Sequence, residues 1–137
     1  MTRKASAVWK GGLKDGNGTV STDSGVLNNS QYSFKTRFED GIGTNPEELL
    51  AAAHAACFSM ALSNQLAQHG LTAESIHTTS TLTMENLTIT KFHLDLVANI
   101  PGADSAEFEA AAKEAKEGCP VSRLFKAEIT LDAKLNA

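Results

Sequence analysis

The chain has 137 residues, of which 42% are hydrophobic and 20% charged, and its formal net charge is −4. These values are ordinary for a soluble globular protein, and the length fits a single domain over residues 1–137. The acidic balance, with no basic patch interleaved with aromatics, argues against nucleic acid as a partner. No apolar run is long enough for a membrane span, and the first residues, MTRKASAVWKGG, lack the apolar core of a secretory signal, so we expect a cytoplasmic protein.

The first forty residues predict short strands separated by glycine turns. KASAVWK is followed by the turn GGLKDGNG, then by TVST and by QYSFKTRF. Arg37 is therefore expected on a strand.

A long helix is predicted after the glycine-rich loop that ends at position 43. Thr44 or Asn45 supplies a polar cap, Pro46 is tolerated in the first turn, and the two glutamates that follow complement the helix dipole. The pattern continues for about 24 residues, or about 36 Å, until a glycine stops it at position 70.

The middle of this helix is apolar on every side, as the run LLAAAHAACFSMAL shows. Such a helix must be covered on every side. Because a domain of this size rarely surrounds a long helix alone, either a sheet wraps it or a second copy of the chain completes the cover.

Residues 72 to 100 change to the alternation of strands, with a turn near positions 85–88. PGADSAEFEAAAKEAKEG predicts a second helix, with Asp104 and Glu107 at capping-box spacing and Gly118 past its end. CPVSRLF begins a short helical turn, and KAEITLDAKL alternates as a last strand. This order of elements indicates an α+β fold.

Cys57 is one of two cysteines and lies in the middle of the apolar helix. Burial there raises a thiol pKa, and the helix N-terminus is too distant to lower it, so on local sequence an inert buried cysteine is favoured. A reactive thiol requires a cation beside the sulfur, and arginine keeps its charge when buried. Of the three arginines, Arg37 just before the helix has the most suggestive position, although a surface strand residue explains it equally well.

Cys119 follows Gly118 and precedes Pro120, so it can begin the next helical turn, where amide groups lower a thiol pKa. That position suits an attacking or a resolving thiol, and equally an incidental one. His54, three residues before Cys57, suggests a cysteine–histidine nucleophile pair or half of a metal site, but a buried histidine bonded to a carbonyl is the simpler interpretation. The spacing of cysteines and histidines contains no usual zinc motif.

Two segments carry a resemblance to a known family: TRFEDGIGTNPEELLAAAHAACFSMAL at 36–62 and AKEGCPVSRLFKAEITLDAKL at 115–135. In these segments, in GTVSTDSGVLN near the start and in the order of its elements, the chain resembles the OsmC/Ohr family of osmotically inducible and organic hydroperoxide resistance proteins. The resemblance covers essentially the whole chain and points to the OsmC branch.

The resemblance implies a thiol-dependent peroxidase that reduces organic hydroperoxides in stress defence. It implies an intertwined homodimer in which antiparallel sheets wrap long central helices, no bound cofactor or metal, and an external dithiol or lipoyl-type reductant. By matching positions, Cys57 is the peroxidatic thiol and Cys119 the resolving thiol, while Arg37 and Glu47 form the polar pair that activates Cys57.

The spacing of Glu47 and Cys57 adds a constraint. Ten residues of one helix separate them, which is about 15 Å, so they cannot meet within one straight helix. If Glu47 holds an arginine at the sulfur, it must come from a second chain whose helix runs antiparallel about a two-fold axis. Such a dimer also covers the apolar helix.

Two other functions stay open at this point. The chain could be a non-enzymatic binding protein on the same dimeric scaffold, in which case peroxide would not join the two cysteines. It could also transfer acyl groups through Cys57 and His54, although no oxyanion-hole motif or orienting acid is visible beside that histidine.

Overall fold

The computed structural model describes residues 1–137 and divides into two compact units, Met1–Leu49 and Leu50–Ala137. The single domain expected over residues 1–137 stays a prediction. No helix has the length and apolar character that crossing a membrane requires.

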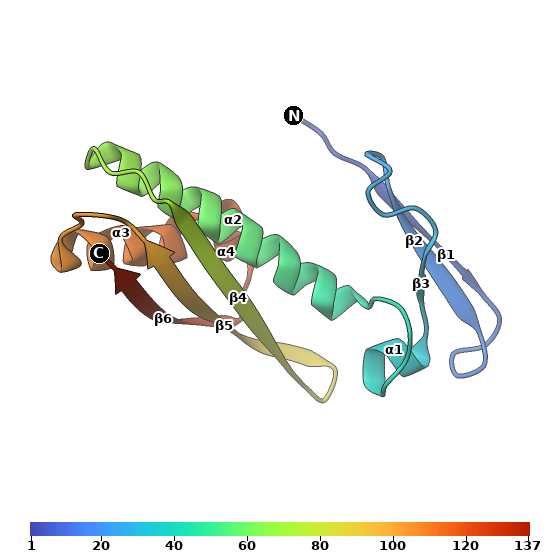
Figure 1. Ribbon diagram of the computed structural model, residues 1–137. Coiled ribbons are helices and arrows are strands. Elements are labelled where there is room, and N and C mark those ends of the chain that lie inside the picture. Colours follow the sequence, from blue (N-terminus) through green and yellow to red (C-terminus); the bar gives the residue numbers. More distant parts are fainter. The chain divides into compact units, whose positions relative to one another are not determined.

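The first unit is a small antiparallel sheet followed by a short helix (Figure 1). Its strands are β1 (Ala5–Lys10), β2 (Asn17–Thr22) and β3 (Ser30–Tyr32), in the order β1-β2-β3. The helix α1 spans Phe34–Phe38. The first two predicted strands are therefore confirmed.

Gly18 of β2 shows why the sheet needs a glycine at this place. The rings of Trp9 and Tyr32 approach each other across it with centroids 5.5 Å apart. A Cβ at position 18 would lie 2.6 to 2.7 Å from atoms of these two rings, closer than side chains pack.

The prediction that QYSFKTRF is one strand, with Arg37 on it, is wrong. The strand ends at Tyr32, and Ser33 caps α1 in a reciprocal arrangement. Ser33 Oγ accepts from the amide of Thr36 at 3.3 Å, and Thr36 Oγ1 accepts from the amide of Ser33 at 2.8 Å. This capping box satisfies two amide donors and starts a helix, so Arg37 lies on α1.

The second unit holds most of the long helix α2 (Pro46–Gln68), whose predicted extent is confirmed within two residues. After it come the strands β4 (Ser75–Glu85) and β5 (Thr88–Asn99). The helices α3 (Ser105–Gly118) and α4 (Pro120–Leu124) and the strand β6 (Glu128–Asn136) complete the unit.

The sheet of this unit has the order β4-β5-β6 and is mixed, so the expectation of antiparallel sheets is correct only for part of it. β4 and β5 form an antiparallel hairpin, and its turn residues Asn86 and Leu87 have φ values of 51° and 62°. β6 pairs with β5 in parallel. The physical reason is the connection between the two strands. Because α3 and α4 carry the chain back to the end of the sheet at which β5 begins, β6 runs in the same direction as β5.

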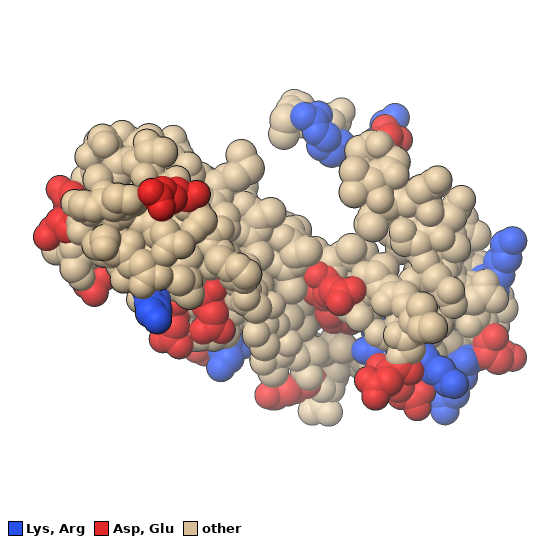
Figure 2. All heavy atoms as spheres, viewed as in Figure 1, with Lys and Arg blue, Asp and Glu red and all other residues tan.

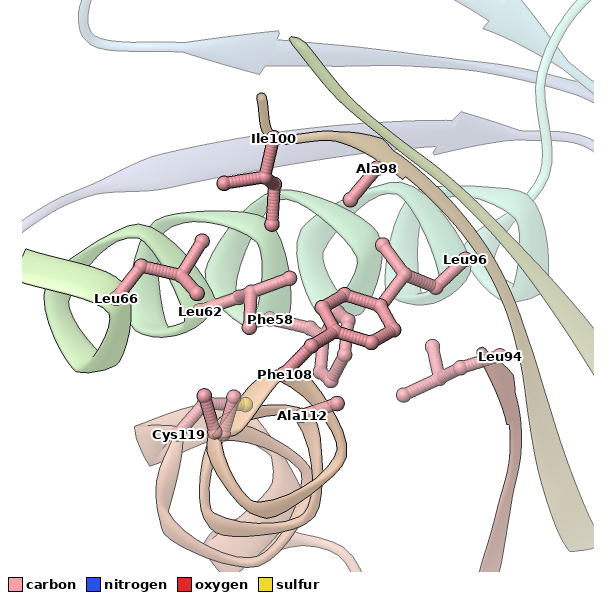
Figure 3. Packing of buried hydrophobic residues seen from close by; sticks show 12 residues of the cluster. Phe58, Leu62, Leu66, Leu94, Leu96, Ala98, Ile100, Phe108, Ala112 and Cys119 are labelled. Carbon is pink, nitrogen blue, oxygen red and sulfur yellow. The ribbon is translucent and has the colours of Figure 1, made fainter. Parts of the chain in front are cut away.

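The hydrophobic core of this unit lies between one face of the sheet and the helices α2 and α3 (Figure 3). Alternate residues of β5 point into it, as the period of two in the sequence predicts. The α3 contribution includes small alanines that allow close approach. The fully buried members are Phe58, Leu62, Leu66, Leu94, Leu96, Ala98, Ile100, Phe108, Ala111, Ala112, Ala115 and Cys119.

The opposite face of α2 is not covered by the other elements of the second unit. Ala52, Ala53 and Ala56 are exposed, and Met60 is 76% exposed although it is a large apolar residue. The helix has no charged residue after Glu48, and the visible surface over its middle carries no charged side chain in Figure 2. The apolar character on every side is thus confirmed, and within the second unit this face of α2 is open to solvent.

Candidate active site

Cys57 and Cys119 line one cleft in the second unit, with a volume of about 410 Å³. Cys57 comes from the middle of α2 and is half-buried, whereas Cys119 is buried, and both are free thiols. The structure therefore brings together two cysteines that lie 62 positions apart in the sequence. The other lining residues are Met60, Ala61, Asn64, Gln65, Glu114, Ala115, Gly118 and Pro120.

The junction of α3 and α4 positions Cys119, as the sequence predicts. Its amide donates to Ala115 O at 3.1 Å and closes α3, and Pro120 occupies the first turn of α4. The sulfur caps α4, because it accepts from the amide of Ser122 at 3.4 Å. The same sulfur lies 3.0 Å from Ser122 Oγ, to which the S–H group donates. Figure 3 shows Cys119 at the edge of the core, next to α3.

The surroundings of Cys57 favour the neutral thiol. Burial raises the pKa of Cys57 above its ordinary value of 9.0, the amide of Val121 opposes this by hydrogen bonding, and Cys119 raises the pKa further by its hydrogen bond and its charge. The expectation that desolvation keeps this thiol protonated is confirmed. A nucleophilic Cys57 needs a positive charge that its own surroundings in this unit do not supply.

Arg37 and Glu47 meet in the first unit. Arg37 Nε donates to Glu47 Oε1 at 2.7 Å, with side-chain exposures of 41% and 11%. Asn45 joins α1 to the start of α2, because its amide donates to Thr36 O at 2.8 Å while its Oδ1 accepts from the amide of Glu48 at 2.7 Å. Asn45 is thus the helix cap, and it fixes the two elements that carry the ion pair.

The ion pair leaves donor and acceptor capacity unused. Glu47 Oε2 is buried and has no hydrogen-bond partner. The guanidinium uses only Nε toward the carboxylate, and it lies 5.3 Å from the centroid of the Phe38 ring. An aromatic pocket of about 270 Å³ adjoins Arg37 and is lined by Trp9, Leu13, Tyr32, Ser33, Phe34, Arg37 and Phe38.

The structure thus pairs Cys57 with Cys119 and Arg37 with Glu47. The two pairs belong to different units.

His54 is fully buried, and its bond goes to a residue that the sequence did not single out. Nε2 lies 2.7 Å from Ser122 Oγ, and burial lowers the pKa of His54, so the ring is neutral at pH 7. The simpler interpretation of a buried, bonded histidine is right except for its partner, which is a hydroxyl and not a carbonyl. The sequence contains one signal for this serine: Ser122 lies three residues after Cys119, which is the spacing between a helix cap and the residue whose amide it accepts from.

Three side chains of the types that bind metal ions lie together on the other face of the second sheet. His93, Asp95 and Asp132 place one donor atom each within 4.8 Å of one another, and His93 Nε2 lies 3.3 and 3.2 Å from the two carboxylates. His93 Nδ1 also contacts Thr130 Oγ1. Both aspartates are exposed, and polar contacts among the three side chains account for the group without an ion.

Comparisons with known proteins identify the protein family. The family model described as OsmC-like protein matches residues 39–134. The fold is similar to a crystal structure of an OsmC-like protein from Mycoplasma pneumoniae, with a TM-score of 0.80 over 100% of this chain and 99% of that one at 14% identity. The chain belongs to the OsmC family.

Two relatives of known kind indicate the type of activity within this family. The chain is 51% identical to peroxiredoxin OsmC of Escherichia coli strain K12, over 98% of this chain and 97% of the relative. It is 28% identical to organic hydroperoxide resistance protein OhrB of Bacillus subtilis strain 168, over 86% and 88% of the two chains. The first likeness places the protein among the peroxidases, which are oxidoreductases.

Proposed function

We propose that the protein reduces organic hydroperoxides to alcohols, and hydrogen peroxide more weakly, through a Cys57 sulfenic acid and a Cys57–Cys119 disulfide. The observation that carries this proposal is the cleft that two free thiols line together. The names of the two curated relatives, a peroxiredoxin and an organic hydroperoxide resistance protein, support the same chemistry.

The chemistry balances without a bound cofactor. The Cys57 thiolate attacks the distal peroxide oxygen, the O–O bond breaks, and the departing alkoxide takes a proton and leaves as the alcohol. The oxidised cysteine is then a sulfenic acid. Cys119 attacks this sulfur, an S–S bond forms, and the hydroxyl leaves as water. An external dithiol, of the lipoyl or a similar type, reduces the disulfide and is itself oxidised.

Arg37 and Glu47 supply the charge that Cys57 lacks. A guanidinium stays protonated when desolvated, and its unused N–H groups can donate to the thiolate and to the peroxide oxygens. Glu47, almost fully buried, holds Arg37 through the 2.7 Å bond. Because the helix separates Glu47 from the Cys57 of its own chain by about 15 Å, the pair acts on Cys57 of a partner subunit.

An intertwined homodimer follows from the same reasoning. The exposed, uncharged face of α2, with Ala53, Ala56 and Met60, would be covered by the α2 of a second copy about a two-fold axis. Small residues on this face allow two helices to approach closely. Two cysteines are too few for a disulfide framework, which suits a reducing compartment, and we place the enzyme in the cytoplasm.

Peroxide consumption with excess dithiothreitol tests the proposal. Wild type is expected to consume cumene hydroperoxide faster than hydrogen peroxide, and Cys57→Ser to lose both activities. Intact mass after one equivalent of peroxide is expected to fall by two protons in wild type but not in Cys119→Ser. Native consumption by Cys57→Ser would refute the proposal, and a wild-type mass that never changes would favour a non-enzymatic binding protein.

A matched control uses the same cleft. Asn64→Ser alters a lining residue that is exposed, adds no charge to the cleft and has no part in the proposed chemistry. It is expected to consume the peroxide at a rate close to that of wild type.

A further inference from the structure

His54, Ser122 and Cys119 form a buried chain of polar contacts that the proposed steps do not use. His54 Nε2 lies 2.7 Å from Ser122 Oγ, and Cys119 Sγ lies 3.0 Å from the same oxygen. The three residues are 0%, 6% and 1% exposed. This chain connects the long helix α2 to the turn that presents Cys119, across 68 positions of sequence.

A histidine is a costly residue at this place. Its ring is edge-on to the rings of Phe92 and Phe125, with centroids 5.3 and 5.2 Å away, and those two rings stack on each other at 4.2 Å. His54 Nδ1 is buried without a hydrogen-bond partner. An apolar side chain would fill these surroundings and leave no polar atom unpaired. What the histidine adds is its contact with Ser122.

The unpaired nitrogen indicates which ring atom carries the proton. Burial lowers the pKa of His54, so the ring is neutral and holds one proton. An unpaired buried N–H is rarer than an unpaired acceptor, which places the proton on Nε2 and leaves a bare lone pair at Nδ1. His54 therefore donates to Ser122 Oγ.

The hydroxyl of Ser122 is then better satisfied when Cys119 is a thiolate. With Cys119 protonated, Ser122 Oγ accepts from both His54 and the thiol, and its own proton has no acceptor. When the thiol loses its proton, the hydroxyl can turn along the same 3.0 Å contact and donate to the sulfur. The amide of Ser122, 3.4 Å from Sγ, donates in both states.

We propose that His54 and Ser122 are positioning residues for the resolving step: His54 holds the Ser122 hydroxyl, which donates to Cys119 as this sulfur attacks the oxidised Cys57. This inference rests on the proposed function, because it concerns how the disulfide forms. The Cys119 proton leaves with the hydroxyl of the sulfenic acid as water, the S–O bond breaks and the S–S bond forms, so no further reactant is needed.

The influence of other titratable groups near Cys119 must be separated from that of Ser122 and His54. Cys57 of α2 and Glu114 of α3 line the same cleft, and Arg123 of α4 is exposed. A Cys57→Ser background removes the first, and the matched variant Glu114→Gln measures what the cleft's carboxylate contributes.

Single-turnover kinetics test the inference. Wild type, Ser122→Ala and Ser122→Thr receive one equivalent of cumene hydroperoxide, a 1,3-diketone traps the sulfenic acid at set times, and intact mass follows the disulfide. Oxidation of Cys57 is expected at the native rate in all three, which also shows that each is folded. Disulfide formation is expected to slow about tenfold to a hundredfold in Ser122→Ala, since a bond to a charged sulfur is lost. Ser122→Thr, which keeps the hydroxyl, is expected to stay within about threefold of wild type.

A second readout separates positioning from packing. In the Cys57→Ser background, the pH midpoint for alkylation of Cys119 is expected to rise by about one pH unit for a tenfold effect in Ser122→Ala and in His54→Phe. His54→Gln, whose amide can donate from about the position of Nε2, is expected to restore it. Glu114→Gln is expected to leave the Ser122→Ala difference unchanged.

Two outcomes overturn the inference: a disulfide that forms at the native rate in Ser122→Ala, or slower formation with an unmoved alkylation midpoint. If wild type itself forms no Cys57–Cys119 disulfide, the proposed function fails instead.

Discussion

Replacing Arg37 by glutamine removes the charge that the proposed mechanism brings to Cys57. Within its own unit, burial and Cys119 raise the pKa of Cys57 above the ordinary 9.0. At pH 7 a thiol with a pKa of 9 is about 1% thiolate, so without help less than about 1% of Cys57 can react. A neighbouring opposite charge lowers the pKa of an acid by about 1 to 3, which raises the thiolate population about 10- to 1,000-fold.

We therefore expect Arg37→Gln to lower kcat/KM for cumene hydroperoxide at pH 7 by at least about tenfold. The loss is expected to shrink as the pH rises, because the variant's thiol ionises at high pH without the guanidinium. Lys35→Gln is the matched control, since Lys35 is an exposed cation on the same short helix. It is expected to keep the native rate.

The assay is the rate of Cys57 alkylation and of peroxide consumption between pH 5 and 10, in a Cys119→Ser background for the alkylation. The reasoning is refuted if Arg37→Gln has the same alkylation midpoint as wild type. It is also refuted if the loss of activity is the same at every pH, because a pure positioning effect would have no such dependence.

Three further changes test the dimer, the core and the cap of α1. Ala56→Glu places a charge on the exposed face of α2 and is expected to give a monomer in light scattering and little peroxidase activity in turnover assays. Ala110→Glu, at an exposed position of α3, is the control and is expected to leave the proposed dimer intact. Leu62→Ala, at a fully buried site, is expected to lower the free energy of unfolding by about 2–5 kcal/mol in urea titrations, and a loss under about 1 kcal/mol would contradict the close packing described. Ser33→Ala removes the hydroxyl that caps α1 and is expected to lower the free energy of unfolding by about 0.5–2 kcal/mol. Because α1 carries Arg37, peroxide turnover is also expected to fall. Unchanged turnover would show that α1 does not contribute to the site.

Elements with a strong local signal could be predicted from the sequence. α2 and α3 have caps and dipole complements, and β4 to β6 alternate, so their positions follow from short-range rules. Gly118, expected just past the end of α3, is its last residue. The helix α1 was missed because FKTRF alternates like a strand, while the hydrogen bonds of Ser33 and Thr36 outweigh that pattern. The parallel pairing of β6 was missed because strand direction depends on a long connection that periodicity does not record.

In the candidate site, too, some features could be predicted from the sequence and others depend on the fold. Cys57 and Cys119 are conspicuous as the only cysteines, and the position of Cys119 at a helix start could be read from its neighbours. Their shared cleft depends on the fold. The contact of His54 with Ser122 joins residues 68 positions apart, and no local pattern predicts it.

The crossover between β5 and β6 has a kinetic consequence. The two strands pair across a separation of 37 residues. The chain must therefore lose the entropy of closing a long loop before the hydrogen bonds between these strands can form. The β4–β5 hairpin, closed by a two-residue turn, meets no such barrier and can form early. Cys119 lies within this crossover. In the proposed mechanism, an oxidant that reaches a half-folded chain would therefore find Cys57 without its resolving thiol. Under the proposed mechanism, nascent molecules would be open to irreversible overoxidation of Cys57, against which a completed Cys57–Cys119 cleft would protect.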